Sequence, residues 1–174
     1  MAAIVEDGGR FLLVEERTTE GLRLNNPAGH LDRGESPLEA VVRETLEETA
    51  RDFTPHSLLG IYLSRFQRLD VVEPPSAASL EAARQPAVED VTYLRIAYSG
   101  SVGAELPGRS YDQPIVRTLW LTADEIRASA ARLRSPLVLR CIEDHLAGRR
   151  YPLDALTTDA SIYTPEIKRR DPAV

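Results

Sequence analysis

Cysteine is nearly absent from this 174-residue chain, and its scarcity limits the classes of protein that the chain can belong to. A single cysteine, Cys141, cannot form an internal disulfide framework or a cysteine-rich zinc site. Small secreted domains usually depend on disulfides, whereas a lone thiol suits a reducing compartment. We therefore expect a cytoplasmic protein in which Cys141 is packed as a small apolar side chain.

Long apolar runs and an excess of basic residues are also lacking. No stretch approaches the length of a membrane-spanning helix, and no charged segment followed by an apolar run suggests a leader. The net charge is −6, and Lys168 is the only lysine. An acidic balance argues against a nucleic-acid polymer or an anionic membrane as the main partner. An anionic small molecule stays compatible, because a bound cation can reverse the local sign of the charge.

The residues that are present have the composition of an ordinary globular domain, with 43% hydrophobic and 28% charged residues. Short apolar runs and amphipathic stretches predict a mixed α and β fold. The apolar run Phe11–Val14 is continuous, which predicts a strand buried on both faces. Strands are expected at residues 2–6, 11–16, 22–25, 58–66, 91–98 and 116–121. Helices are expected to begin at Pro37, after Thr122 and at Pro136, the last of them ending near Gly148.

The organisation along the chain favours one domain over residues 1–156, followed by a polar C-terminal tail over 157–174. Residues 69–89 contain three prolines and predict a loop, with one helical turn near 80–84. A loop of this length in a compact domain is typical of a lid or a binding loop. A second loop is expected over residues 100–113.

The most informative segment is NPAGHLDRGESPLEAVVRETLEETA, residues 26–50. Ser36, Pro37 and Glu39 form a capping-box pattern that opens a helix. Glu44, Glu47 and Glu48 then follow at spacings that place three carboxylates on one helical face, with Cβ atoms about 5–6 Å apart. Most acidic helix faces are solvated surface, and that reading suits any one of these glutamates alone. For the whole set, Mg²⁺ is the better explanation, because it is a hard cation that prefers oxygen ligands and would relieve the repulsion.

This segment resembles the Nudix box over residues 29–51. The box consists of Gly, five residues, Glu, seven residues, Arg-Glu, an aliphatic residue, any residue, Glu-Glu, any residue and Gly. Its glycine and charged positions are matched by Gly29, Glu35, Arg43, Glu44, Glu47 and Glu48. Two positions depart from the pattern: Thr45 replaces the aliphatic residue and Ala50 replaces the second glycine. Alanine is strained at positive φ. The helix is therefore expected either to end at Ala50 with a strained backbone there or to run on toward Phe53.

The resemblance implies a Nudix fold, an α/β (α+β) architecture in which a mixed sheet lies between helices as an α/β/α sandwich. It also implies that Glu44, Glu47 and Glu48, with the carbonyl of Gly29, bind Mg²⁺ or Mn²⁺. The same three glutamates form the catalytic group, and Glu44 is the better candidate for the general base. Arg43 is expected to reach Glu47 and Glu35. We assign Arg43 and Glu35 to supporting the box.

Further segments are similar to bacterial NudJ-type phosphatases, a group within the Nudix superfamily. These segments are NNPAGHLDRGE, WLTADEI and LRSPLVLRCIEDHLAGRRYPLDAL. The similarity implies hydrolysis of nucleoside triphosphates and diphosphates, and of hydroxymethylpyrimidine or thiamine diphosphate, with release of inorganic phosphate. It departs at Leu24, where an aromatic residue that stacks on a ring is expected. By resemblance alone a monomer is favoured slightly over a homodimer.

Two alternatives stay open at this stage. One is a Nudix pyrophosphatase acting on a nucleoside diphosphate conjugate such as ADP-ribose, and the other is a catalytically silent Nudix binding module. Two further residues are candidate substrate ligands. His30 lies beside Gly29, although a histidine with a local backbone bond is an equal alternative. Arg95 lies on an alternating strand, where a phosphate-binding role and a structural ion pair are equally compatible with the sequence.

Overall fold

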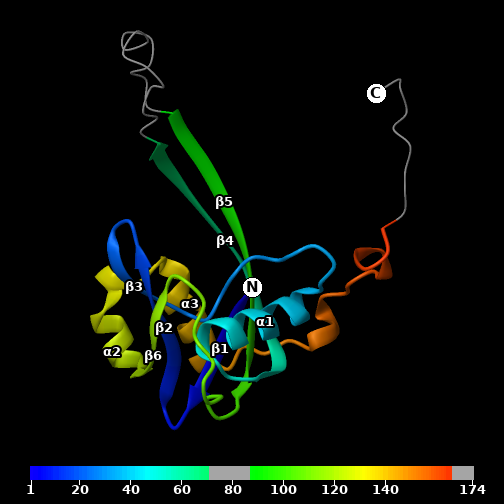
Figure 1. The fold of residues 1–174 in the computed structure, drawn as a ribbon, viewed down its shortest axis with the longest axis horizontal. Coiled ribbons are helices and arrows are strands. Elements are labelled where there is room, and N and C mark those ends of the chain that lie inside the picture. The colour runs from blue at the N-terminus through cyan, green and yellow to red at the C-terminus, as the bar shows by residue number, and fades with distance from the viewer. Residues whose placement is uncertain (71–86, 166–174) are drawn as a thin grey trace.

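The computed structural model describes residues 1–70 and 87–165 of the chain (Figure 1). Its strands are β1 (Ala2–Asp7), β2 (Arg10–Thr18), β3 (Gly21–Asn25), β4 (Phe53–Asp70), β5 (Ala87–Val102) and β6 (Ile115–Thr122). Its α-helices are α1 (Pro37–Thr49), α2 (Ala123–Ala128) and α3 (Pro136–Leu146). The expected mixed α and β architecture is confirmed, and so are the starts of all three helices.

The six strands form a mixed sheet in the order β3-β2-β1-β5-β4, and β6 also pairs with β2. The β1–β2 hairpin links the two halves of this sheet, since β1 runs parallel to β5 and antiparallel to β2. This hairpin follows from Gly8 and Gly9, which both adopt positive φ at the turn, a conformation that glycine accepts without strain.

Both faces of the sheet are covered. Alternate residues of β1 and β2 enter two different apolar clusters, because successive side chains of a strand point to opposite faces. Ile4 and Phe11 pack with α2 and α3, whereas Val5 and Leu12 pack with Val41 of α1. Each large side chain buried in this way contributes about 1.5–3 kcal/mol. The prediction that Phe11–Val14 is buried on both sides is confirmed.

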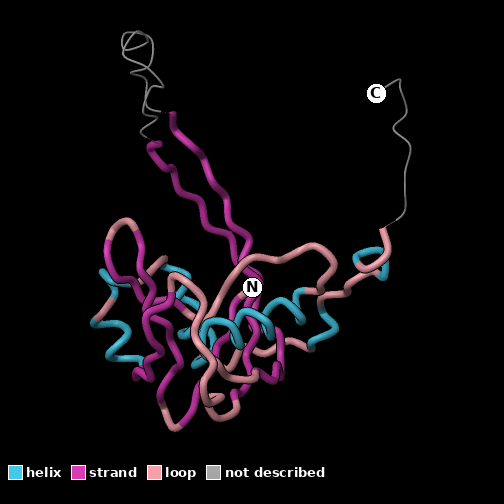
Figure 2. Tube along the Cα trace, in the orientation of Figure 1, coloured by secondary structure: helices cyan, strands magenta, loops and turns pink. Residues whose placement is uncertain are grey.

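Two strands are longer than the sequence predicted. β4 begins at Phe53 and continues through Asp70, and β5 begins at Ala87 and continues through Val102. The predicted loops were therefore wrong at residues 69–70, 87–89 and 100–102, where backbone pairing between β4 and β5 continues. The helical turn predicted near residues 80–84 lies outside the described residues. Beyond the body of the protein, β4 and β5 extend as a two-stranded arm (Figure 2).

Helix α1 ends at Thr49 and does not run on toward Phe53. Ala50 adopts the left-handed conformation with φ 53°, and its N–H donates to the carbonyl of Leu46. Its methyl group is fully buried. We attribute the tolerance of this strained alanine to that burial and to the capping hydrogen bond, both of which offset a cost of about 1 kcal/mol.

Candidate active site

The orientation of α1 is fixed by its two faces. Ser36 accepts a hydrogen bond from the Glu39 N–H at 3.2 Å, and Glu39 accepts one from the Ser36 N–H at 2.7 Å, so the predicted capping box is present. Val41, Thr45 and Thr49 are buried on the inner face. The helical period then directs the glutamates at 44, 47 and 48 away from that core.

Arg43 is the centre of a dense ionic network. Its guanidinium donates to both carboxylate oxygens of Glu35, at 3.0 and 2.7 Å, in a bidentate arrangement. It also donates to Glu44 and to Glu47, each at 2.9 Å, and to the carbonyl of His30 at 3.0 Å. The two contacts that the sequence predicted for Arg43, with Glu47 and Glu35, are both present. Arg43 thus ties the loop before α1 to the acidic face of the helix.

Glu48 is the most perturbed carboxyl group of this face. Burial raises its pKa to about 8, although its carboxylate accepts a hydrogen bond from the Ala28 N–H at 2.8 Å. The negative charges of Glu44, Glu16 and Asp112 raise it further. Burial also raises the pKa values of Glu44 and Glu16. Several carboxyl groups that resist ionisation have therefore been gathered in one place, which is a property of functional sites.

Gly29 lies directly against the Glu44 carboxylate. A Cβ atom built on Gly29 would lie 2.0 Å from the carboxyl carbon of Glu44, so no other residue type fits there without displacement. The carbonyl of Gly29 accepts a hydrogen bond from the amino group of Met1. The predicted ligands Gly29 and Glu44 are thus neighbours in the structure, although they are 15 positions apart in the sequence.

The donor atoms suit a hard divalent cation, because carboxylate and carbonyl oxygens are the ligands that Mg²⁺ prefers. Within the described residues, however, no three His, Cys, Asp or Glu side chains converge as a metal site. The three glutamates of the box do not converge because each is held by another hydrogen bond. Arg43 donates to Glu44 and Glu47, while Glu48 accepts from the Ala28 N–H. The chemistry of the donors and the cradle formed by Gly29 and Glu44 fit the metal. Binding would require the carboxylates to exchange some of these contacts.

The two candidate substrate ligands lie at the edge of this site. The guanidinium of Arg95 donates to the side-chain oxygens of Asn26 and Asn25, at 3.2 and 3.3 Å. These two hydrogen bonds go to neutral amides, and the positive charge of Arg95 also interacts with the Glu16 carboxylate. The exposed ring of His30 lies 6.3 Å from that of Tyr93, measured between centroids.

Sequence reasoning missed Glu16, and Asp112 is a second acid whose charge acts on Glu48. Glu16 follows the buried run of β2, and its carboxylate accepts from Asn25 at 3.3 Å and pairs with Arg134 at 3.4 Å. The Asp112 N–H donates to the Glu47 carbonyl at 3.0 Å, which docks its loop onto α1. The adjacent acids Glu15 and Glu16, placed directly after an apolar run, were a signal that could have been used. Leu24 is buried in the core, so this position presents no surface to a ring.

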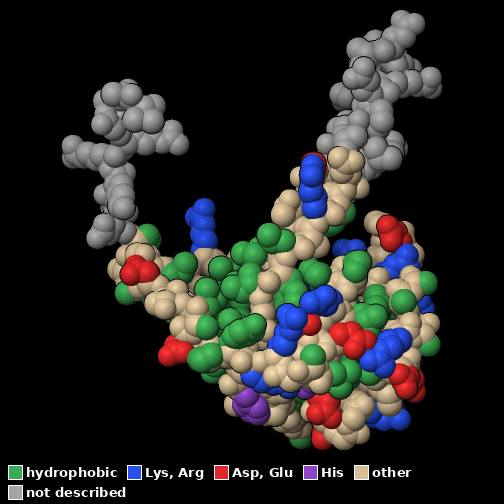
Figure 3. Space-filling view, turned by 180° about the vertical axis from the view of Figure 1, so that it is seen from behind, with side chains coloured by type: hydrophobic (Ala, Val, Ile, Leu, Met, Phe, Trp, Pro, Cys, Tyr) green, Lys and Arg blue, Asp and Glu red, His purple; other side chains and the backbone are tan. Residues whose placement is uncertain are grey.

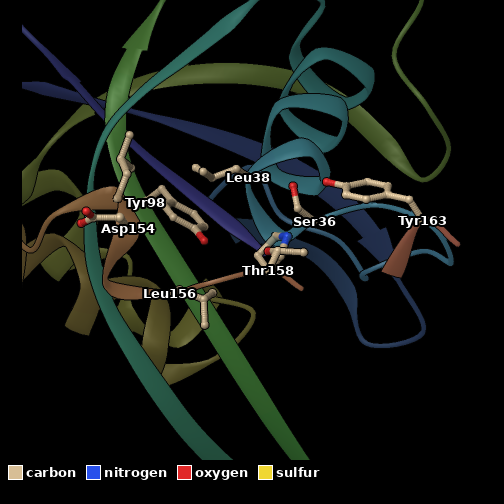
Figure 4. Close-up of a pocket in the computed structure, with 9 residues that line it drawn as sticks. Ser36, Leu38, Tyr98, Asp154, Leu156, Thr158 and Tyr163 are labelled. Carbon is tan, nitrogen blue, oxygen red and sulfur yellow. The ribbon is translucent and has the colours of Figure 1, made fainter. Parts of the chain in front are cut away.

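Two hollows of the surface lie apart from these carboxylates. One, of about 340 Å³, is lined by the start of α1, by Tyr98 of β5 and by the segment after α3 (Figure 4). The other, of about 360 Å³, lies between β4 and Tyr151. The hydroxyl of Tyr98 is buried without a hydrogen-bond partner among the described residues.

The sandwich fold and the acidic loop-helix define a hydrolase of the Nudix class. The NUDIX domain model matches residues 1–141, and the chain belongs to this family. The chain is 30% identical over 156 residues to phosphatase NudJ of Escherichia coli K12, covering 90% of this chain and 88% of that protein. A NUDIX hydrolase structure from Nitrosomonas europaea is 44% identical, with a TM-score of 0.73, covering 91% of this chain and 94% of the other.

A third structure, an ADP-ribose pyrophosphatase from Streptococcus suis, is 15% identical with a TM-score of 0.54, covering 86% of this chain and 92% of that one. This likeness supports the fold alone.

The expected Nudix fold is confirmed. The protein is an enzyme that acts on phosphorus-containing acid anhydrides. Nudix hydrolases generally use divalent metals and act on small organic phosphates. Helices in the described part of the chain are too short or too polar to span a membrane.

Proposed function

We propose that the protein is a Mg²⁺-dependent phosphatase that hydrolyses phosphoanhydride bonds of nucleoside triphosphates and diphosphates and releases inorganic phosphate. Hydroxymethylpyrimidine diphosphate and thiamine diphosphate are proposed as further substrates. The observation that carries this proposal is the set of carboxyl groups around Glu48. Such a set is costly in a protein that binds no cation, because burial and like charges both oppose its ionisation.

Glu44, Glu47 and Glu48, with the Gly29 carbonyl, are the proposed metal ligands, and Mn²⁺ is an expected substitute. When bound, the metal supplies charge neutralisation for the phosphates and lowers the pKa of water. Glu44 is the proposed general base, because burial raises its pKa and its carboxylate lies against the Gly29 backbone. We propose that Arg43 and Glu35 hold the loop and the helix at a fixed separation.

The proposed substrate contacts come from outside the acidic face. Arg95 is placed to attract a phosphate, since its guanidinium donates to the uncharged side chains of Asn25 and Asn26 and lies near the Glu16 carboxylate, which offsets part of its charge. His30 follows Gly29 directly and is exposed. The similarity to NudJ over nearly the whole chain supports a phosphatase in preference to the alternative on nucleoside diphosphate conjugates. The single buried thiol, Cys141, supports a cytoplasmic location.

The test is phosphate release from nucleoside di- and triphosphates, hydroxymethylpyrimidine diphosphate, thiamine diphosphate and ADP-ribose. Each reaction is run with Mg²⁺ and with chelator, and each product is identified. We expect Mg²⁺-dependent phosphate release from several nucleotides. Nucleoside monophosphate from ADP-ribose alone would instead establish the pyrophosphatase, and turnover that is unaffected by chelator would refute the metal site.

A further inference from the structure

The arm formed by β4 and β5 carries several exposed apolar side chains. A two-stranded ribbon is only marginally stable in water, so large apolar groups on it require a reason. Hydrophobic side chains gather around the root of this arm (Figure 3). The exposed large hydrophobic residues of the two strands are Ile61, Leu63, Phe66, Tyr93 and Leu94.

Strand pairing separates these residues into two faces. Leu63 pairs with Leu94, whereas Ser64 pairs with Tyr93. Since side chains alternate along a strand, Ile61, Leu63 and Leu94 share one face and Phe66, Tyr93 and Arg95 share the other. Arg95 donates to Asn25 and Asn26 of the body, so the aromatic face is the one that continues into the candidate active site.

Phe66 and Tyr93 form a flat aromatic surface, which we call the aromatic ledge. Their ring centroids are 5.5 Å apart and their planes differ by 15°, a stacked arrangement. The two residues are 41% and 39% exposed. Two parallel rings with accessible surface present the geometry on which a third ring stacks.

The ledge is connected to the carboxylates by two short routes. Tyr93 faces His30, which directly follows Gly29 at the Glu44 carboxylate. On β5, Arg95 is two residues from Tyr93 on the same face, about 6.6 Å along the strand. From Arg95 the contacts continue through Asn26 to the segment whose Ala28 N–H binds Glu48. A ring surface, a cation and a carboxylate cluster therefore follow one another from the arm to the box.

We propose that the aromatic ledge binds the heteroaromatic ring of an organic di- or triphosphate substrate, with Tyr93 as the stacking residue that determines this specificity. The inference rests on the proposed function, because it assigns the anionic part of the same molecule to Arg95 and the acidic face. A nucleotide carries the matching order of groups, with a planar ring at one end and phosphates at the other. The aliphatic face, with Leu63 and Leu94, offers no such surface.

The experiment compares Tyr93→Ala with the matched control Leu63→Ala, which truncates an exposed side chain on the opposite face of the same arm. Each is assayed with a nucleoside triphosphate and with inorganic triphosphate, which has the same anhydride bonds but no ring. Loss of one stacking contact predicts about a tenfold rise in KM for the nucleotide. For Tyr93→Ala, inorganic triphosphate should be hydrolysed within about twofold of wild type, and Tyr93→Trp should restore the nucleotide KM. The control should be unchanged with both substrates.

An equal loss on both substrates, or an unchanged nucleotide KM, would overturn the proposal. If wild-type protein hydrolyses neither substrate, calorimetry with a non-hydrolysable nucleoside triphosphate analogue and Mg²⁺ separates the two hypotheses. Tenfold weaker binding by Tyr93→Ala would then support the ring-binding role of the aromatic ledge, although the phosphatase assignment would be wrong. Absence of binding by the wild-type protein would refute that role. A change in sedimentation of Tyr93→Ala without a change in KM would assign the ledge to contact between two copies of the chain.

Discussion

Glu48 shows how one residue can be unfavourable for folding and useful for binding. Its carboxyl group is buried among other acids, and its pKa is raised to about 8 from an ordinary value of 4.5. Below pH 4.5 the proton is bound in both the folded and the unfolded state, so the group has no effect on stability. Between pH 4.5 and 8 only the folded state retains the proton, and the free energy of unfolding falls as the pH rises.

Glu48→Gln should therefore stabilise the metal-free protein at alkaline pH. Glutamine keeps an oxygen that can accept from the Ala28 N–H but removes the charge. In chelator, the gain in the free energy of unfolding should be small at pH 4.5, grow up to about pH 8, and reach a few kcal/mol, at about 1.4 kcal/mol per pKa unit. Urea unfolding across this range measures it.

The same variant separates stability from function. Glu48→Gln should lose nearly all Mg²⁺-dependent turnover, and added Mg²⁺ should raise its melting temperature less than that of wild type. If the free energies of unfolding of Glu48→Gln and wild type differed by the same amount at every pH, the raised pKa assigned to the buried Glu48 would be wrong. Wild-type-like turnover in the variant would remove Glu48 from the metal ligands.

At the scale of the element, the box is a loop and a helix joined by one side chain. Arg43 contacts Glu35 and the His30 carbonyl on the loop side, and Glu44 and Glu47 on the helix side. Arg43→Ala should leave these carboxylates to repel one another without compensation. We expect a loss of about 1–3 kcal/mol in the free energy of unfolding and lower activity, most marked at limiting Mg²⁺.

Arg43→Lys is the matched variant, because lysine keeps the charge but cannot form the bidentate contact with Glu35. Its activity should lie between those of wild type and Arg43→Ala. The measurement is the rate against Mg²⁺ concentration for all three proteins. Identical curves for wild type and Arg43→Ala would show that Arg43 does not support the box.

The accuracy of sequence-based prediction differed between elements for physical reasons. The start of α1 was predicted to the residue, because Ser36, Pro37 and Glu39 act locally. Its end was left open, because Ala50 is held by burial and not by its own conformational preference. The outer parts of β4 and β5 were taken for loop, because their pairing joins residues that are distant in sequence, such as Gln67 and Asp90.

The candidate site divides in the same way. Arg43 and its contacts to Glu35 and Glu47 follow from spacing along one helix and its preceding loop. Glu16, Asp112 and Tyr93 enter from β2, from the loop before β6 and from β5. Their proximity depends on sheet order and on strand register, which side-chain patterns specify only weakly before the topology is known.

At the scale of the whole molecule, two apolar clusters stabilise the sheet from both sides, and within the described residues all of their members precede residue 157. The partly buried hydrophobics Leu153 and Leu156 are the last to pack against either cluster. Beyond them, the Tyr163 hydroxyl donates to Glu39 at 2.8 Å from an exposed position. Glu39 also accepts from the Ser36 N–H, so the capping box does not depend on Tyr163.

Removal of residues 157–174 should therefore leave a folded enzyme. We expect Mg²⁺-dependent kcat/KM within about twofold of the full chain, because the acidic face of α1 and the arm contain no residue of this segment. The stability loss should be about 1 kcal/mol, the value of one exposed hydrogen bond, which lowers Tm by about 2–4 °C. Full-length Tyr163→Phe isolates that bond and should account for most of the difference. A truncated protein that unfolds without cooperativity, or that loses activity while staying folded, would show that the domain extends past residue 156.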